Sequence, residues 1–105
     1  MFLTVTQVFL STRDMLFKGK LRALVDAAGA EVTLDLDAAD LLVVELESKE
    51  WEERVRAGVA RGIPVLAFGS HVDAERLRAA RALGAEAVPN SQIETRLGAQ
   101  LQRRA

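Results

Sequence analysis

Short apolar runs alternate along the chain with segments in which apolar residues recur every three or four positions. The runs, which predict strands, are Val5–Leu10, Val32–Leu36, Leu41–Leu46, Ile63–Phe68 and Ala87–Val88. The spaced apolar positions predict helices over Phe17–Ala28, Trp51–Val59, Leu77–Leu83 and Ile93–Leu101. The resulting order, βα-ββα-βα-βα, is typical of a doubly wound α/β domain.

Two of the predicted strands are apolar without interruption. Leu41–Val44 and Ile63–Phe68 do not alternate between apolar and polar residues, as is typical of strands buried on both faces of a parallel sheet. A glycine follows three of the predicted helices, at Gly29, Gly62 and Gly84. Glycine is the residue that most easily takes the left-handed conformation at a helix end, so these positions support the predicted boundaries.

The link between the second and third predicted strands is too short for a full helix. Parallel strands need a crossover of about a dozen residues, and too few residues separate Val32 from Leu41. Either the second strand ends near Leu34 and Asp35–Asp40 forms a short crossover, or the two strands form an antiparallel hairpin. We favour the short crossover, because the rest of the pattern is regular. In both cases the helix between strands two and three is reduced or missing, and we expect this to leave an apolar strip that a second protein chain covers.

Composition and charge restrict the function further. The chain has 105 residues, which predicts one domain over residues 1–105. With 14 basic and 15 acidic residues the net charge is −1, so we expect no nucleic-acid partner. The apolar N-terminal stretch is interrupted by Thr4 and Thr6, and no apolar run approaches the ~20 residues that span a bilayer, so we expect neither a signal peptide nor a membrane partner. Because the chain has no cysteine, we expect a cytoplasmic protein.

Polar residues follow the predicted strands at the edge where doubly wound sheets bind ligands. They are Ser11, Thr12 and Arg13 after the first strand, Glu45 at the end of the third, Ser70 and His71 after the fourth, and Asn90 and Ser91 after the fifth. One hypothesis is a small-anion or phospho-ligand pocket formed by Arg13, Ser70, His71 and Asn90. A single histidine, no cysteine and no nucleophile-elbow motif around Ser70 predict no metal site and no catalytic residue.

Three segments resemble the receiver domains of two-component response regulators. Asp40–Leu46 resembles the strand that ends in the phosphoacceptor aspartate, Gly62–Ser70 the strand that ends in the switch Ser/Thr, and Leu83–Val88 the turn before the last strand. They occur in the receiver order, and the resemblance extends over essentially the full length. It implies a CheY-like (flavodoxin-like) doubly wound fold, with a parallel five-stranded sheet in the order 2-1-3-4-5.

The residues at the receiver's functional positions differ from that pattern. Receivers carry an acidic pair after the first strand that holds Mg²⁺, and here Ser11 and Thr12 stand in its place. Glu45 stands at the phosphoacceptor position, and its extra methylene moves the carboxylate away from where an aspartate would hold it. Phosphoryl transfer needs a metal to neutralise the developing charge, so the resemblance implies a degenerate site that uses no cofactor.

The other two receiver positions are also changed. Gly69 takes the place of the switch hydroxyl, with Ser70 next to it, and Asn90 or Ser91 takes the place of the lysine after the last strand. Without that lysine the product oxygens lack a cation. The degenerate phosphorylation site therefore comprises Ser11, Thr12, Glu45, Gly69, Ser70 and Ser91.

These departures imply a pseudo-receiver, a module in signalling or regulation that acts through protein contacts and is not an enzyme. We expect a protein partner, and a homodimer in particular. Trp51 begins the helix next to the shortened crossover, where an anchor for that partner would lie. Two alternatives are the anion-binding domain described above and a conventional receiver with a shifted phosphoacceptor.

Overall fold

Five parallel strands form one sheet in the order β2-β1-β3-β4-β5. The computed structural model describes residues 4–104, so residues 1–3 and 105 of the predicted domain lie outside the described residues. The elements are β1 (Gln7–Ser11), α1 (Met15–Ala27), β2 (Glu31–Val32), β3 (Leu41–Glu45), α2 (Trp51–Ala60), β4 (Val65–Gly69), α3 (Ala74–Leu83), β5 (Glu86–Pro89) and α4 (Ile93–Arg104). The predicted parallel sheet and its strand order are confirmed.

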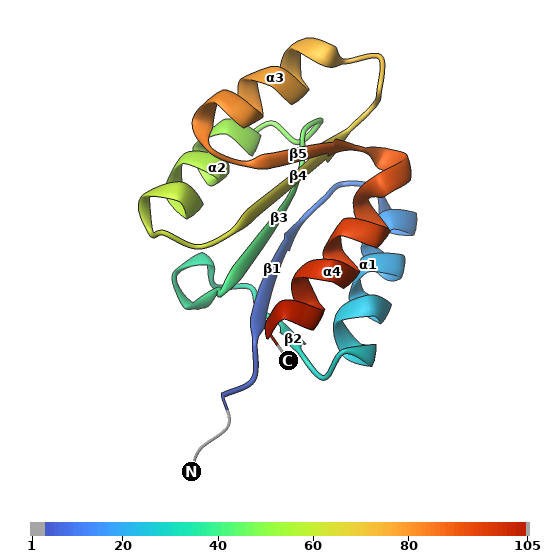
Figure 1. Cartoon of the computed structure of the whole chain (residues 1–105), viewed down its shortest axis with the longest axis vertical. Coiled ribbons are helices and arrows are strands. Elements are labelled where there is room, and N and C mark those ends of the chain that lie inside the picture. Colours follow the sequence, from blue (N-terminus) through green and yellow to red (C-terminus); the bar gives the residue numbers. More distant parts are fainter. Residues whose placement is uncertain (1–3, 105) are drawn as a thin grey trace.

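Helices cover both faces of the sheet (Figure 1). α1 and α4 pack on one face, where Val8, Val43 and Phe68 meet Leu21 and Leu97 in a buried apolar cluster. α2 and α3 pack on the other face over a second cluster, which contains Leu42, Val44, Val55 and Leu77 among others. Every residue of β3 and of β4 is buried, as the uninterrupted apolar runs predict.

The predicted helix ends are confirmed at the three glycines. Gly29, Gly62 and Gly84 have φ angles of 77°, 75° and 110°. At Gly84, which caps α3, a side chain would be strained by this backbone conformation and would also crowd Val59. The sequence therefore places the boundaries between helices and strands correctly at these points.

The crossover between β2 and β3 is reduced to one short 3₁₀ helix, Leu36–Ala38. β2 ends at Val32, pairs in parallel with β1 and lies on the opposite side of β1 from β3. The short crossover is therefore confirmed and the hairpin is wrong. Arg61, which follows the last residue of α2, stabilises the crossover, since its guanidinium donates to the backbone carbonyls of Leu36 (2.7 Å) and Ala39 (3.0 Å).

The expected apolar strip beneath the missing helix is not present. Phe9 of β1 points to the α2 side of the sheet, so Gln7 and Ser11 of the same strand point there too. Gln7 is polar and hydrogen-bonds to Glu31 of β2 (3.4 Å), which leaves Phe9 as the apolar side chain of β1 on this side. Our expectation was wrong because the aliphatic residues of β1 itself, Val8 and Leu10, lie on the α1 side.

Both edges of the sheet are short or covered. β2 has two residues. At the other edge, Arg81 of α3 donates from Nε (3.1 Å) and Nη2 (2.8 Å) to the backbone carbonyl of Ala87 in β5. No helix in residues 4–104 has the length and apolar character needed to cross a membrane.

Candidate functional site

Glu45 ends β3 at the carboxyl edge of the sheet, and its carboxylate is buried and held by the loop after β1. The residue is 6% exposed. Its Oε1 atom accepts hydrogen bonds from the Thr12 hydroxyl (3.1 Å) and from the backbone N–H of Arg13 (2.9 Å). Hydrogen bonds to an ionised carboxylate are stronger than neutral ones, so these two contacts fix the carboxylate against the β1–α1 loop.

Ser11, the residue before Thr12, is also buried and hydrogen-bonded. It is 4% exposed, and its hydroxyl oxygen accepts a hydrogen bond from Nη1 of Arg54 in α2. The same guanidinium pairs with Glu50 (2.9 Å) and lies over the ring of Phe9, with 5.5 Å between its central carbon and the ring centroid. A cation therefore lies at the carboxyl end of β1.

Leu46 occupies the space next to Gly69, the residue that the resemblance aligns with the switch hydroxyl of receivers. Leu46 is 1% exposed. A Cβ atom built on Gly69 would lie 3.3 Å from the Cβ atom of Leu46 and 3.5 Å from its Cδ1 atom. Because this is tighter than ordinary contact, a side chain at position 69 requires Leu46 to move.

The residues after β4 and β5 serve local roles. The Ser70 hydroxyl oxygen accepts from the backbone N–H of Val72 (3.3 Å). His71 is exposed in the turn, and within residues 4–104 its ring makes no hydrogen bond or ion pair. Asn90 is half-buried in a 3₁₀ helix, with an Oδ1 atom that finds no partner in the described part of the chain. Ser91 is exposed.

The four residues of the predicted anion pocket are not brought together. Arg13 lines two shallow pockets at this edge, of ≈ 250 Å³ and ≈ 330 Å³. The first is otherwise lined by Asp14, Glu45 and Glu47, and the second by Ser48, Lys49, Glu50 and Arg54. Ser70, His71 and Asn90 line neither. Carboxylates surround Arg13 in the first pocket, whereas in the second Arg13, Lys49 and Arg54 outnumber the carboxylate of Glu50, so a pocket for an anion at this edge would share only Arg13 with the predicted set.

Trp51 is half-buried and packs against the core cluster beneath α2 and α3. Its ring therefore contributes to the fold of its own chain. Its role as an anchor for a partner stays a prediction.

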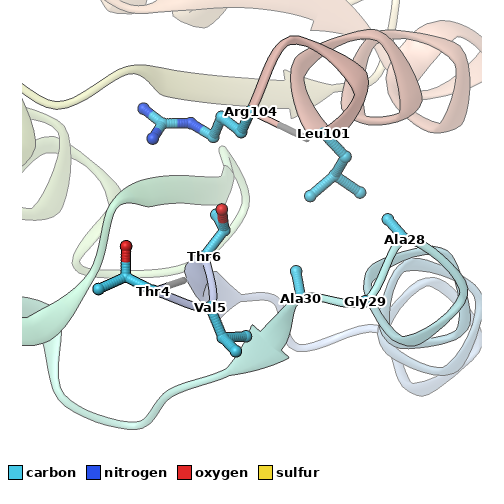
Figure 2. Close-up of a pocket in the computed structure, with 8 residues that line it drawn as sticks. All are labelled: Thr4, Val5, Thr6, Ala28, Gly29, Ala30, Leu101 and Arg104. Atoms are coloured by element: carbon cyan, nitrogen blue, oxygen red, sulfur yellow. The ribbon is translucent and has the colours of Figure 1, made fainter. Parts of the chain in front are cut away.

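A further pocket lies at the opposite edge of the sheet, where α1 and α4 end (Figure 2). Its volume is ≈ 310 Å³, and it is lined by Thr4, Val5, Thr6, Ala28, Gly29, Ala30, Leu101 and Arg104. Figure 2 shows apolar side chains along one side and the hydroxyl groups of Thr4 and Thr6 on the other. These lining residues include no acid and no histidine, so they provide neither a general base nor a metal ligand.

Solved structures with similar folds are receiver domains. No protein-family model matches the chain, and comparison with curated proteins gives no match. A response regulator receiver protein from Pseudoalteromonas atlantica superposes with a TM-score of 0.72 at 16% identity, covering 93% of this chain and 95% of that chain. A CheY-like protein, TadZ, from Pseudomonas aeruginosa gives 0.71 at 19% identity, covering 95% and 99%. An orphan response regulator of H. pylori gives 0.67 at 19% identity, covering 93% and 92%.

These likenesses establish the fold. The chain has the CheY-like receiver fold, with four α-helices around the five-stranded parallel sheet within residues 4–104. At these levels of identity they do not transfer the chemistry of any one of those proteins.

The residues at the carboxyl edge do not fit the Mg²⁺ that receivers hold. Ser11, the last residue of β1, and Thr12, which follows it, offer neutral hydroxyl groups, and these hydroxyls already bond to Arg54 and Glu45. Asp14, the nearest acid in the loop, caps α1 by accepting from the backbone N–H groups of Leu16 and Phe17. Within residues 4–104, no group of three or more acids and histidines is arranged to hold a metal ion.

Two residues of this site carry no signal in the sequence. Leu46 reads as the end of a strand, and Arg54 reads as one of several charges on the exposed face of a helix. The contact between Arg54 and Ser11 joins residues far apart in the chain, so no local spacing indicates it. The indirect sequence feature that points to Arg54 is the missing crossover helix. Without that helix, a side chain of α2 has to cover Phe9 on the α2 side of the sheet.

Proposed function

We propose that the chain is a pseudo-receiver: a response-regulator-like module that does not accept a phosphoryl group and acts by protein contact rather than catalysis. The observation that carries the proposal is the state of Glu45. Its carboxylate is buried and accepts two hydrogen bonds from the β1–α1 loop. Both bonds go to Oε1, and one of them occupies the Thr12 hydroxyl, so Thr12 offers no charged ligand for the metal that a phosphoacceptor needs opposite the phosphorus atom.

The surroundings of Glu45 support the same proposal. Ser11 and Thr12, at the end of β1, lack the carboxylates that bind Mg²⁺ in receivers, and Arg54 lies against Ser11. Gly69 has no hydroxyl, and Leu46 fills the space beside it. No side chain at this position can therefore hydrogen-bond to a phosphoryl group. Each change removes a different part of phosphoryl-transfer chemistry.

The test is incubation with acetyl phosphate and Mg²⁺, followed by intact mass spectrometry, with a conventional receiver treated in parallel. We expect no mass change in the wild-type chain and none in Glu45→Asp, because restoring the acceptor alone restores neither the metal nor the switch hydroxyl. A gain of one phosphoryl group by the wild type contradicts the proposal. If Glu45→Gln abolishes that gain, Glu45 is the acceptor; if the gain persists, the chain is a conventional receiver with a shifted site.

A protein partner, in the cytoplasm and without nucleic acid, completes the proposal. Large apolar side chains are strongly exposed in the segments that follow two strands of the carboxyl edge: Met15 (77%) and Leu16 (76%) after β1, and Val72 (78%) after β4. Apolar groups that remain exposed beside a functional edge favour a contact with another protein. The net charge of −1 gives no basic field for nucleic acid.

We further propose that this partner can be a second copy of the chain. Light scattering over a series of concentrations measures the mass in solution, and we expect a dimer that Leu16→Ser weakens. A monomer at every concentration rejects self-association and leaves the phosphorylation test unaffected.

A further inference from the structure

Arg54 has a set of contacts unlike those of the other arginine–glutamate pair on α2. Its side chain is 31% exposed, and its guanidinium contacts the Ser11 hydroxyl, the Glu50 carboxylate and the face of the Phe9 ring. Arg56, two residues later, pairs with Glu52 at 3.0 Å, but its side chain is 62% exposed. Arg54 therefore points into the molecule toward β1, while Arg56 points to solvent.

The contact with Ser11 links α2 to Glu45 through consecutive residues of the chain. Ser11 accepts from Arg54, and the next two residues, Thr12 and Arg13, donate to the Glu45 carboxylate. Arg54 on α2 and Glu45 on β3 thus hold the end of β1 from opposite sides. Arginine suits this position because its guanidinium stays protonated, is weakly hydrated and stacks on aromatic rings.

The guanidinium of Arg54 lies at a position that affects metal binding. The resemblance aligns Ser11 with the first residue of the acidic pair of receivers, so on this alignment the guanidinium contacts the position from which a carboxylate would reach a metal. A resident positive charge repels a divalent cation at short range, and the partly buried setting weakens solvent screening.

We propose that Arg54 is the resident cation of this site: it takes over the organising role of a divalent metal and excludes the metal itself. The site then keeps one arrangement whether or not Mg²⁺ is present. The inference concerns the same site as the proposed function, but its test uses no phosphoryl donor, so the two fail separately.

The experiment measures Mn²⁺ affinity, by titration calorimetry and water-proton relaxation, in a variant that restores the acidic pair, Ser11→Asp/Thr12→Asp. We expect this variant to bind Mn²⁺ weakly. Adding Arg54→Gln, which retains an amide donor but removes the charge, should tighten binding at least about tenfold, since a tenfold change corresponds to a modest electrostatic interaction. Adding Arg56→Gln instead is the matched control and should leave the affinity of the acidic-pair variant unchanged.

Three results overturn the proposal. The first is equal Mn²⁺ affinity with and without Arg54. The second is no binding by any variant, because removing Arg54 would then not open the site. The third is tight Mn²⁺ binding by the wild-type chain.

A second measurement keeps Arg54 in place, in case its replacement prevents folding. Ser11→Asp puts a carboxylate against the guanidinium, whereas Ser11→Asn is its neutral counterpart of the same size. We expect the Asp variant to melt about 2–6 °C above the Asn variant, the shift that one partly exposed ion pair produces in a domain of this size. The difference should shrink in 1 M NaCl, where the Debye length is about 3 Å. If the Asp variant melts at or below the Asn variant, Arg54 does not act there as a cation, and the proposal is wrong.

Discussion

Removing the Glu45 carboxylate should destabilise the fold, although the residue lies at the edge of the sheet. Glu45→Ala deletes two hydrogen bonds to an ionised group, each worth about 1.5–3 kcal/mol. Arg13 is exposed, so water can accept the hydrogen bond of its backbone N–H once the carboxylate is removed. The lower end of this range therefore applies. We therefore expect Glu45→Ala to lower the free energy of unfolding by about 2–4 kcal/mol.

Glu45→Gln separates the hydrogen bonds from the charge. Both donors bond to the same oxygen, Oε1, so a single amide oxygen can accept both. The loss should be about 1 kcal/mol, since the bonds become neutral. Glu47→Ala is the control. Glu47 is an exposed acid in the loop between β3 and α2, and its removal should change stability by no more than about 0.5 kcal/mol.

Urea unfolding, followed by the fluorescence of the single tryptophan, Trp51, measures these differences. The slope against urea should stay the same in all variants, so that midpoints report stability. Equal losses for Glu45→Ala and Glu45→Gln, or a loss below about 0.5 kcal/mol for Glu45→Ala, would show that the buried carboxylate is not held as argued.

Three further changes have definite expected outcomes. Gly58→Ala should lower stability by about 1–3 kcal/mol in urea unfolding, because the new Cβ would lie 2.7 Å from Cγ2 of Val65; unchanged or raised stability refutes this close approach of α2 to the sheet. Asp14→Ala should cost about 1 kcal/mol in the same assay by removing the cap of α1, and no loss would contradict the capping role. A hydrogen bond from Arg96 holds the pKa of Glu86 below its ordinary value of 4.5, so the contribution of Glu86 is present above that pH and is lost as the pH falls through the lowered pKa. The stability difference between wild type and Glu86→Gln should thus be small, since the pair is more than a third exposed, and should decrease towards acid; a difference that grows in acid refutes the sign.

The fold was predictable because its signals are local. Uninterrupted apolar runs such as Leu41–Val44 indicate strands buried on both faces, and the positive φ angles of Gly29 and Gly84 confirm two predicted helix ends. The second strand was predicted less well: its apolar run reaches Leu36, but the strand ends at Val32. Leu34 is 92% exposed, so apolar character alone did not mark a strand there.

At the site, the residue types follow from the sequence, but the side chains that surround them do not. The residue types at positions such as Glu45 and Gly69 follow from the sequence once the strands are aligned with a receiver. Which side chains occupy the remaining space depends on contacts across the fold, as with Leu46 beside Gly69 and Arg54 against Ser11. The anion hypothesis stays a prediction, and the two pockets that Arg13 lines contain none of its other three residues, Ser70, His71 and Asn90.

The two ends of the sheet determine how the chain can meet other proteins. An open edge strand offers unpaired N–H and C=O groups on which another chain can add a strand, and long open edges lead to aggregation. β2 offers only two residues for such pairing, and the double hydrogen bond from Arg81 already uses the Ala87 carbonyl of β5. Both features disfavour growth of the sheet from one molecule into the next, so we expect association between copies to use helices and loops.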